Sequence, residues 1–471
     1  MNLYMVAVIA YLVFMALLGV YFSKKSIKNS EDFIVAGRSL PLLVVIGTLL
    51  ATAVGSGTVI GGASFIYQYG PIAAIFNLSG GFLAALVLFF IAGKVRKGGS
   101  YTVPQMIEIR FGSKARLIAS LLIIFAYVGI AAYQFTGGAY VLQLTIGVPL
   151  EVGTLIMAAL VIFLTVSGGL FSVAYTDAIS AFLIIVGFLI GVPYVLNEVG
   201  WLSGLASSLP STQASWNGGL SIPQLIGFFL PLFLLILGDQ NMYQRFSASK
   251  NESVAKKSTI GFFITNVIVI ALTIILATTA IVIFPNITPD TAILEIAVSG
   301  VPVAIGMFIL SAAVAFLITT ATSYLLSASG NVVYDLVQKY SKTQISDKKL
   351  LWLNRSTVLT LGILAYVLGQ FFPSVLAMQM YAYTMYGAAL TPAILATLLW
   401  KKATTAGIIS SMIAGGVGTI LWEIVWDKPF DWNSVLFALP LSLLALIIVS
   451  SLTNNNQINT EFDKDFKEYT S

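Results

Sequence analysis

The feature that most constrains this chain is a succession of apolar segments, each long enough to cross a lipid bilayer. A transmembrane helix needs about 20 consecutive, predominantly apolar residues, and segments of this length recur along the 471 residues. Hydrophobic residues make up 58% of the chain and charged residues only 9%, whereas soluble domains carry about 25% charged residues. The sequence therefore predicts an all-α polytopic membrane protein.

Thirteen transmembrane helices are predicted, with approximate boundaries. The segments are 3–22, 40–66, 71–93, 118–147, 151–170, 175–196, 224–243, 259–284, 303–335, 354–371, 376–400, 404–424 and 433–452. If the N-terminus lies outside, only Lys428 of the 24 basic residues falls on the outer side. Because cytoplasmic loops carry an excess of Lys and Arg, we expect a multi-pass protein of the cell (plasma) membrane with a cytoplasmic C-terminus. Arg245 counts among the inner-side residues, so no Lys or Arg is expected within the core of a span.

Two of these segments carry helix-breaking residues. The second contains GTLLATAVGSGTVIGG (47–62), with five glycines, and the seventh carries Pro231 and Gly238-Asp239. Close helix packing alone explains glycines in a single span. However, the two interrupted segments lie five apart and so run in opposite directions across the membrane. This pattern predicts two five-helix repeats of inverted topology with a transport site at their centre.

Hydroxyl side chains cover one face of the ninth segment. Residues 319–329 read TTATSYLLSAS, with six Ser or Thr, and at 100° per residue they fall on one half of the helix. Single hydroxyls in membrane helices usually bond to their own backbone carbonyls. Six on one face favour the lining of a site for a hard cation such as Na⁺. Asp177, at the start of the sixth segment, either caps the helix or binds a cation.

The chain contains no Cys and no His. It therefore has no disulfides and no thiolate nucleophile, and it lacks the commonest metal ligand and general base. Neither an HExxH nor a GxSxG pattern is present, so we do not expect an enzyme. The basic residues are explained by membrane topology, and we expect no nucleic-acid partner.

Four stretches together resemble the sodium/solute symporter family, which includes the proline, galactose and sialic acid symporters. The stretch GGLFSVAYTD (168–177) is similar to the family signature GGxxAVxxTD, with Ser172 at the Ala position. The other matching stretches are ATAVGSGT (51–58), DQNMYQR (239–245) and residues 319–335. The resemblance covers nearly the whole chain.

The resemblance implies a LeuT-like fold, in which a five-plus-five inverted repeat has one leading and two trailing helices. The corresponding parts are 1–39 (leading helix and inner loop), 40–196 (first repeat), 197–222 (outer loop), 223–400 (second repeat) and 401–471 (trailing helices and cytoplasmic tail). It also implies Na⁺-coupled symport of a small organic solute into the cell by alternating access, with a monomer sufficient for function. The alternatives are an ion or solute channel and a transporter-like sensor without coupled uptake.

The resemblance also implies ligands for sodium. The first sodium site would use the carbonyl oxygens of Ala51, Val54 and Phe316 and the hydroxyls of Thr319 and Thr320. A second sodium site, present in some members of the family, would use Asp177, Thr319, Thr322 and Ser323.

Substrate contacts are expected where similar transporters have them. These positions are Ser56, Thr58, Asp239, Gln240 and Tyr381, and Asp239-Gln240 has a polar helix cap as its alternative role. Ala53 stands where proline symporters have Asp, and Thr58 stands where sugar-type members have Gln. Both departures argue against those two substrates. With no basic residue expected in a span core, a carboxylate substrate would depend on helix N-termini.

Overall fold

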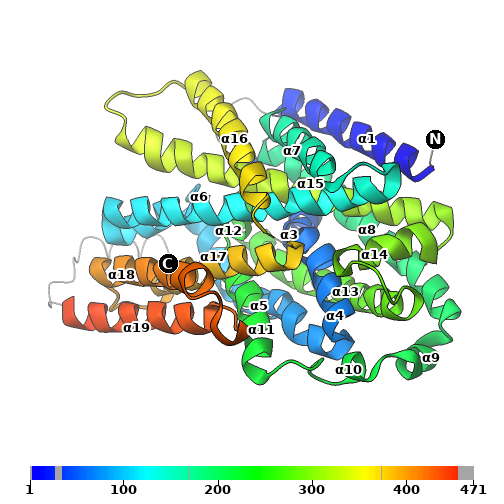
Figure 1. The fold of residues 1–471 in the computed structure, drawn as a ribbon. Helices are drawn as coiled ribbons and strands as arrows, with labels where there is room; N and C mark the ends of the chain where they lie inside the picture. The colour runs from blue at the N-terminus through cyan, green and yellow to red at the C-terminus, as the bar shows by residue number, and fades with distance from the viewer. Residues whose placement is uncertain (1–2, 27–33, 168, 373, 454–471) are drawn as a thin grey trace.

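The computed structural model describes residues 3–26, 34–167, 169–372 and 374–453. The parts of the predicted inner loop at 27–33 and of the tail at 454–471, and Gly168 of the signature stretch, lie outside these residues. All regular secondary structure in the described residues is helical, apart from one isolated β-bridge between Leu40 and Ser249. The prediction of an all-α protein is confirmed (Figure 1).

The helices follow the predicted segments closely. In chain order they are α1 (Leu3–Ser26), η1 (Ala36–Arg38), α3 (Leu42–Ser56), η2 (Gly57–Gly62), α4 (Ala63–Tyr69), α5 (Pro71–Gly98), α6 (Val103–Ile146), α7 (Leu150–Ser167), α8 (Leu170–Glu198), α9 (Trp201–Ser208), α10 (Ser211–Ala214), α11 (Ile222–Gly238), α12 (Gln240–Ala248), α13 (Glu252–Ile283), η3 (Pro289–Thr291), α14 (Ala292–Glu295), η4 (Ile296–Gly300), α15 (Val303–Gly330), η5 (Asn331–Gln338), α16 (Asp347–Gly369), α17 (Val375–Leu399), α18 (Thr405–Ile420), η6 (Leu421–Val425), η7 (Pro429–Asp431) and α19 (Val435–Thr453). Within the described residues, 12 helices are long and apolar enough to span a membrane. The first predicted segment, 3–22, corresponds to α1, whose apolar part, Leu3–Leu18, is shorter.

Both interrupted segments are broken where the sequence predicts. In the second segment, Gly55 departs from helical geometry (φ −7°, ψ −159°), and the π-helical stretch η2 follows it. In the seventh, α11 ends at Gly238, and Asp239 is extended (φ −62°, ψ 120°) before α12 begins. Backbone groups freed inside a membrane need protein partners or a cavity. Both breaks lie in the buried interior, so this condition is met by surrounding protein.

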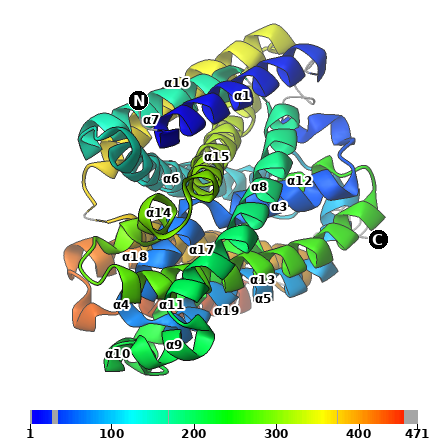
Figure 2. The same cartoon turned by 90° about the vertical axis from the view of Figure 1, so that its right-hand side faces the viewer.

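The broken helices and their partners form the centre of the bundle. The span of α17 is 89% buried and that of α3 to α4 is 78% buried, whereas α7 and α16 are each only 33% buried. Both views place α1, α7 and α16 along one edge of the protein (Figures 1 and 2). Residues buried by protein contacts therefore gather around α3, α15 and α17, and the edge helices present apolar side chains to lipid.

Some local structure was not predicted. The loop 197–222 carries the short helices α9 and α10, and helical structure in α6 begins at Val103, before the predicted residue 118, with a break at Gly112 (φ 78°, ψ 178°) between a short leading part and the long spanning part. This earlier start has a local cause, because the Thr102 side chain caps α6 by accepting a hydrogen bond from the Gln105 backbone N–H.

Candidate functional site

The break in α3 brings that helix against the hydroxyl face of α15. The Thr320 hydroxyl donates to the carbonyl oxygen of Ala51 over 2.9 Å. A Cβ on Gly55 would lie 2.7 Å from Thr320 Oγ1, so a side chain at position 55 would prevent this approach. Ala51 and Thr320, two of the expected ligands of the first sodium site, are therefore in direct contact.

The other three expected ligands of that site surround this contact. Thr319 donates to the carbonyl of Phe316 over 3.3 Å, within α15. The carbonyl of Val54 accepts from the N–H of Gly57 across the break. All five expected residues are buried. The break thus gathers uncharged oxygen atoms from α3 and α15, which is the ligand type that hard cations prefer.

Asp177 is fully buried in α8 and does not cap that helix. The helix begins at Leu170, and Gly169 stands at its N-cap. Asp177 Oδ2 accepts from the Thr48 hydroxyl over 2.5 Å and lies 3.3 Å from Arg245 Nη2. The other carboxylate oxygen, Oδ1, has no hydrogen-bond partner among the described residues. This geometry leaves one oxygen of a buried carboxylate free to bind a further cation.

Arg245 contradicts the expectation that no basic residue lies within a span core. Its side chain is 0% exposed, and besides Asp177 it donates to the hydroxyls of Thr48 (2.9 Å) and Ser323 (2.8 Å). The expectation failed because α12 continues the broken seventh segment through the protein interior as far as Ala248. Only Asp177 indicated the Asp177–Arg245 pair in the sequence, because a charge in a membrane segment requires a partner.

The remaining residues expected at the second sodium site differ in their contacts. Ser323 accepts from Arg245 and so faces Asp177, and the Thr319 hydroxyl lies beside the same carboxylate. Thr322 donates to the carbonyl of Thr319 over 2.9 Å and satisfies its own helix. Ser327 reaches across to α12, where its hydroxyl oxygen lies 2.6 Å from both Asn241 Oδ1 and Gln244 Oε1 and can donate to one of them.

Asp239 and Gln240 are fully engaged with protein groups in this conformation. The Asp239 carboxylate accepts from the hydroxyls of Tyr127 and Tyr324 and from the backbone N–H of Asn241, which caps α12. The side chain of Gln240 exchanges two hydrogen bonds with Asn331 (2.8 and 3.0 Å). These contacts match the capping role that was the alternative to substrate binding.

A group of uncharged polar residues surrounds the break on its other sides. We call this group the neutral polar cluster, and it consists of Ser56, Tyr133, Gln134, Gln379 and Tyr383. Three of its buried atoms have no partner among the described residues, namely Ser56 Oγ, Gln134 Nε2 and Gln379 Oε1.

Two contacts fix the arrangement of the neutral polar cluster. The Ser56 backbone N–H donates to Gln134 Oε1 over 2.8 Å, so the free atom of this amide is its nitrogen. The hydroxyls of Tyr133 and Tyr383 lie 3.1 Å apart and join α6 to α17. The cluster thus offers free donors and acceptors at the centre of the protein without a charged group.

The sequence predicted only part of this cluster. Ser56 was expected, and Thr58 is buried next to it in η2. Tyr381, which was also expected, packs its ring against Phe372, whereas Tyr383 faces the break. The sequence did contain an indication of the cluster members that were missed, because Gln134 and Gln379 are amide side chains inside otherwise apolar segments.

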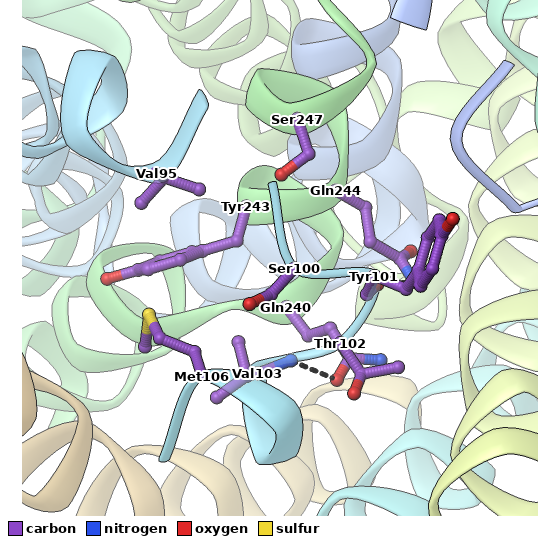
Figure 3. A pocket seen from close by; sticks show the side chains of 10 residues that line it. All are labelled: Val95, Ser100, Tyr101, Thr102, Val103, Met106, Gln240, Tyr243, Gln244 and Ser247. Atoms are coloured by element: carbon purple, nitrogen blue, oxygen red, sulfur yellow. Dashed lines mark hydrogen bonds between the residues drawn. The ribbon is translucent and has the colours of Figure 1, made fainter. Parts of the chain in front are cut away.

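One end of the central site is closed by a charged network. The Asp335 carboxylate in η5 accepts from Thr102 (3.0 Å) and Asn331 (2.9 Å) and lies 2.7 Å from Arg116 Nη2. Figure 3 shows the adjacent space, where the Val103 N–H donates to Gln240. This cavity has a volume of about 10 Å³, enough for at most one water molecule.

The opposite end is more open and contains a buried carboxylate. There a cavity of about 210 Å³ is lined by residues that include Gln68, Ser374 and Met380. Next to it, Asp290 of η3 accepts from the backbone N–H of Val375 over 3.1 Å. Burial raises the pKa of the Asp290 carboxyl, although hydrogen bonds from Ser64 and Val375 act in the opposite direction.

Comparisons with known proteins agree on one family. The family model described as sodium:solute symporter family matches residues 33–415. A sodium/proline symporter of Haemophilus influenzae is 26% identical over 94% of this chain and 93% of its own length. A sodium/proline symporter of Staphylococcus aureus is 24% identical over 97% of this chain and 94% of its own length.

Solved structures show the same fold. A Na⁺-coupled sialic acid symporter superposes with a TM-score of 0.80 at 21% identity, over 95% of this chain and 98% of its own. The nucleobase-cation-symport-1 family transporter Mhp1 gives 0.61 at 13% identity, over 93% and 99%. MhsT, solved in complex with L-phenylalanine, gives 0.58 at 15% identity, over 88% and 99%. The expected LeuT-like class of fold is confirmed by these neighbours.

Proposed function

Because the chain belongs to the sodium:solute symporter family, we propose that it carries a small organic solute into the cell together with Na⁺ by alternating access. The protein is a multi-pass integral membrane protein. The solute classes that fit the family are amino acids, amines, vitamins, sugars and monocarboxylates. The proposal includes no enzymatic reaction.

The observation that carries this proposal is the contact of Thr320 with Ala51 at the helix break. In the proposed first site, Na⁺ lies between α3 and α15 and is bound by the carbonyls of Ala51, Val54 and Phe316 and the hydroxyls of Thr319 and Thr320. To bind Na⁺, the Thr320 hydroxyl turns its proton away from the Ala51 carbonyl, so that both oxygens face the ion. Motion of α3 relative to α15 then changes the binding of Na⁺, which links ion binding to the conformational change.

The proposed second site lies at Asp177 and shares its carboxylate with Arg245. Na⁺ binds the unpartnered Oδ1 together with hydroxyls of Thr319, Thr322 and Ser323, while Arg245 keeps Oδ2. The fixed positive charge of Arg245 weakens Na⁺ binding here. The second site is therefore the weaker of the two and fills after the first.

The solute is proposed to bind at the neutral polar cluster, next to the first sodium site. Gln134 Nε2 offers a donor and Gln379 Oε1 offers an acceptor, and both lack a protein partner among the described residues. An unpaired buried polar group costs about 1–3 kcal/mol, so a solute that satisfies both groups removes this cost. Ser56 and Thr58 lie at the same break, and Asp239, Gln240 and Tyr381 become contacts only in another conformation.

The proposed topology has 13 membrane helices, with α1 leading and α18 and α19 trailing the two five-helix repeats 40–196 and 223–400. The N-terminus lies outside, so the Asp335 network closes the cytoplasmic end and the cavity next to Asp290 opens outward. Each Na⁺ that enters at a membrane potential of about −100 mV supplies roughly 2.3 kcal/mol. Two ions therefore support about a thousandfold gradient of a neutral solute.

A thermal-shift screen followed by an uptake assay tests this function. A solute that raises the melting temperature of the purified protein only when Na⁺ is present identifies the substrate, because both ligands bind the folded state. Labelled solute should then accumulate in proteoliposomes under an inward Na⁺ gradient and not under an equal K⁺ gradient. Equal uptake with Na⁺ and K⁺ would refute Na⁺-coupled symport.

The outward opening of the Asp290 end should depend on pH. In this structure the Asp290 carboxyl is buried beside the cavity, which raises its pKa, and further opening of this end would expose the carboxyl to water and return the pKa towards its ordinary value. The less open form therefore binds the proton more tightly, and lowering the pH from neutral towards that ordinary value disfavours further opening.

A single engineered thiol measures this opening, because the natural chain has no Cys. In the variant Met380→Cys, the rate of thiol labelling should fall with decreasing pH more steeply than the thiol's own ionisation explains. The matched control is Met380→Cys combined with Asp290→Asn, which should show the ionisation of the thiol alone. Identical pH profiles for the two proteins would rule out the role of Asp290.

A further inference from the structure

A groove of about 780 Å³ runs between α7 and α16, away from the transport site. Both helices lie along one edge of the protein (Figures 1 and 2), and each span is only 33% buried. The floor of the groove forms where the two helices meet, since a Cβ on Gly362 would lie 2.4 Å from the side chain of Ile162. In a membrane protein, this surface faces the hydrocarbon of the bilayer.

The groove is apolar along its length and has a single charged residue near one end. Six residues of α16 line it, namely Trp352, Arg355, Ser356, Leu359, Ile363 and Tyr366. From Trp352 to Tyr366 the helix rises about 21 Å, which is roughly two-thirds of the ~30 Å hydrocarbon core. These dimensions suit an extended acyl chain.

Arg355 lies where α16 changes from polar to apolar. The residues before it include Asp347, Lys348 and Lys349, and the stretch from Val358 to Gly369 is almost entirely apolar. Trp352 is 65% exposed one turn away on the same face. Trp residues concentrate at the headgroup level of membranes, so Arg355 lies at the depth of lipid phosphates.

The charge of Arg355 is not balanced by an ion pair in the part of the chain that the structure describes. Its side chain is exposed, and no ion pair involves it within the described ranges. Acidic side chains are also missing from the residues that line the groove. A basic group at headgroup depth beside an apolar groove is the arrangement that binds anionic lipid headgroups in other membrane proteins.

We propose that the groove between α7 and α16 is a binding site for one anionic phospholipid. The phosphate and the net negative headgroup contact Arg355, the glycerol region lies beside Trp352, and one acyl chain fills the groove towards Tyr366. A second copy of the chain could also cover an apolar face, but it would bury the unbalanced Arg355 charge, which is costly without a partner. The site is independent of the proposed transport function.

Native mass spectrometry of the full-length protein tests this site. The purified protein is delipidated in detergent and then mixed with equal amounts of phosphatidylglycerol and phosphatidylcholine. We expect the protein to retain one phosphatidylglycerol at least fivefold more often than one phosphatidylcholine. Arg355→Gln should remove this preference, whereas Arg355→Lys should keep most of it.

Two further variants distinguish lipid binding in the groove from a general attraction of anionic lipid to positive charge. Ala159→Phe fills the groove without changing the charge and should lower the retention of both lipids. Lys349→Gln removes a charge on the same helix outside the groove and should leave the preference unchanged. Equal retention of the two lipids by the natural chain would overturn the proposal. So would an equal loss of the phosphatidylglycerol preference in Arg355→Gln and Lys349→Gln, or a dimer of the protein that carries no lipid. Sodium-dependent uptake is not part of the readout, so this result does not depend on the transport assay.

Discussion

Thr320→Val should weaken sodium binding to the purified protein by about 10- to 100-fold. The substitution keeps the shape of the side chain but replaces the hydroxyl that contacts the Ala51 carbonyl with a methyl group. A hydrogen bond or ligand contact to a charged group is worth about 1.5–3 kcal/mol, and each 1.4 kcal/mol changes an affinity tenfold. Equilibrium binding of radioactive Na⁺ with K⁺ in excess measures the effect.

Thr397→Val is the matched control for this prediction. Thr397 is also fully buried in a central helix, but its hydroxyl donates to the carbonyl of Ala393 within α17 (2.7 Å). Sodium affinity should therefore be unchanged in Thr397→Val. If the two variants bind sodium equally well, Thr320 is not a ligand and the first sodium site is wrongly assigned.

Asp177→Asn should destabilise the protein by about 3–5 kcal/mol, because it leaves Arg245 as an uncompensated charge in the interior. Both side chains of this pair are 0% exposed. Thermal unfolding in detergent should show a lower melting temperature for Asp177→Asn. The double variant Asp177→Asn with Arg245→Gln should recover part of the loss, since neither charge remains.

The same variants test the second sodium site. Asp177→Asn should reduce the number of bound Na⁺ ions from two to one at saturation, while the tighter site is retained. Arg245→Gln alone should raise the affinity of the weaker site, because the competing positive charge is gone. A stoichiometry that is the same in the natural chain and in Asp177→Asn would show that Asp177 serves only as the partner of Arg245.

The sequence predicted the helices and the two breaks because these features depend on local composition. Apolar length sets each span, and glycine at Gly55 or an extended Asp239 interrupts the backbone hydrogen bonds of a helix. The contact between α3 and α15 followed from the family resemblance combined with the hydroxyl face of residues 319–329. These parts of the structure could be predicted without knowing which distant side chains contact one another.

The missed parts of the site depend on contacts between distant segments. Arg245 was counted as a loop residue because the distribution of charges cannot show that α12 passes through the interior towards Asp177. Tyr383 was missed in favour of Tyr381, although two residues along a helix point about 200° apart. Only the packing of α17 against the break determines which of the two rings faces the centre.

The coupled flux of Na⁺ and solute tests the central claim most directly. Entry of radioactive Na⁺ and of labelled solute is measured in the same proteoliposomes, for the natural chain and for Thr320→Val and Thr397→Val. The account predicts that each flux requires the other ligand in the natural chain and in Thr397→Val, and that both fluxes fall together in Thr320→Val. Sodium entry that proceeds without solute, or solute entry that proceeds without sodium, would contradict it.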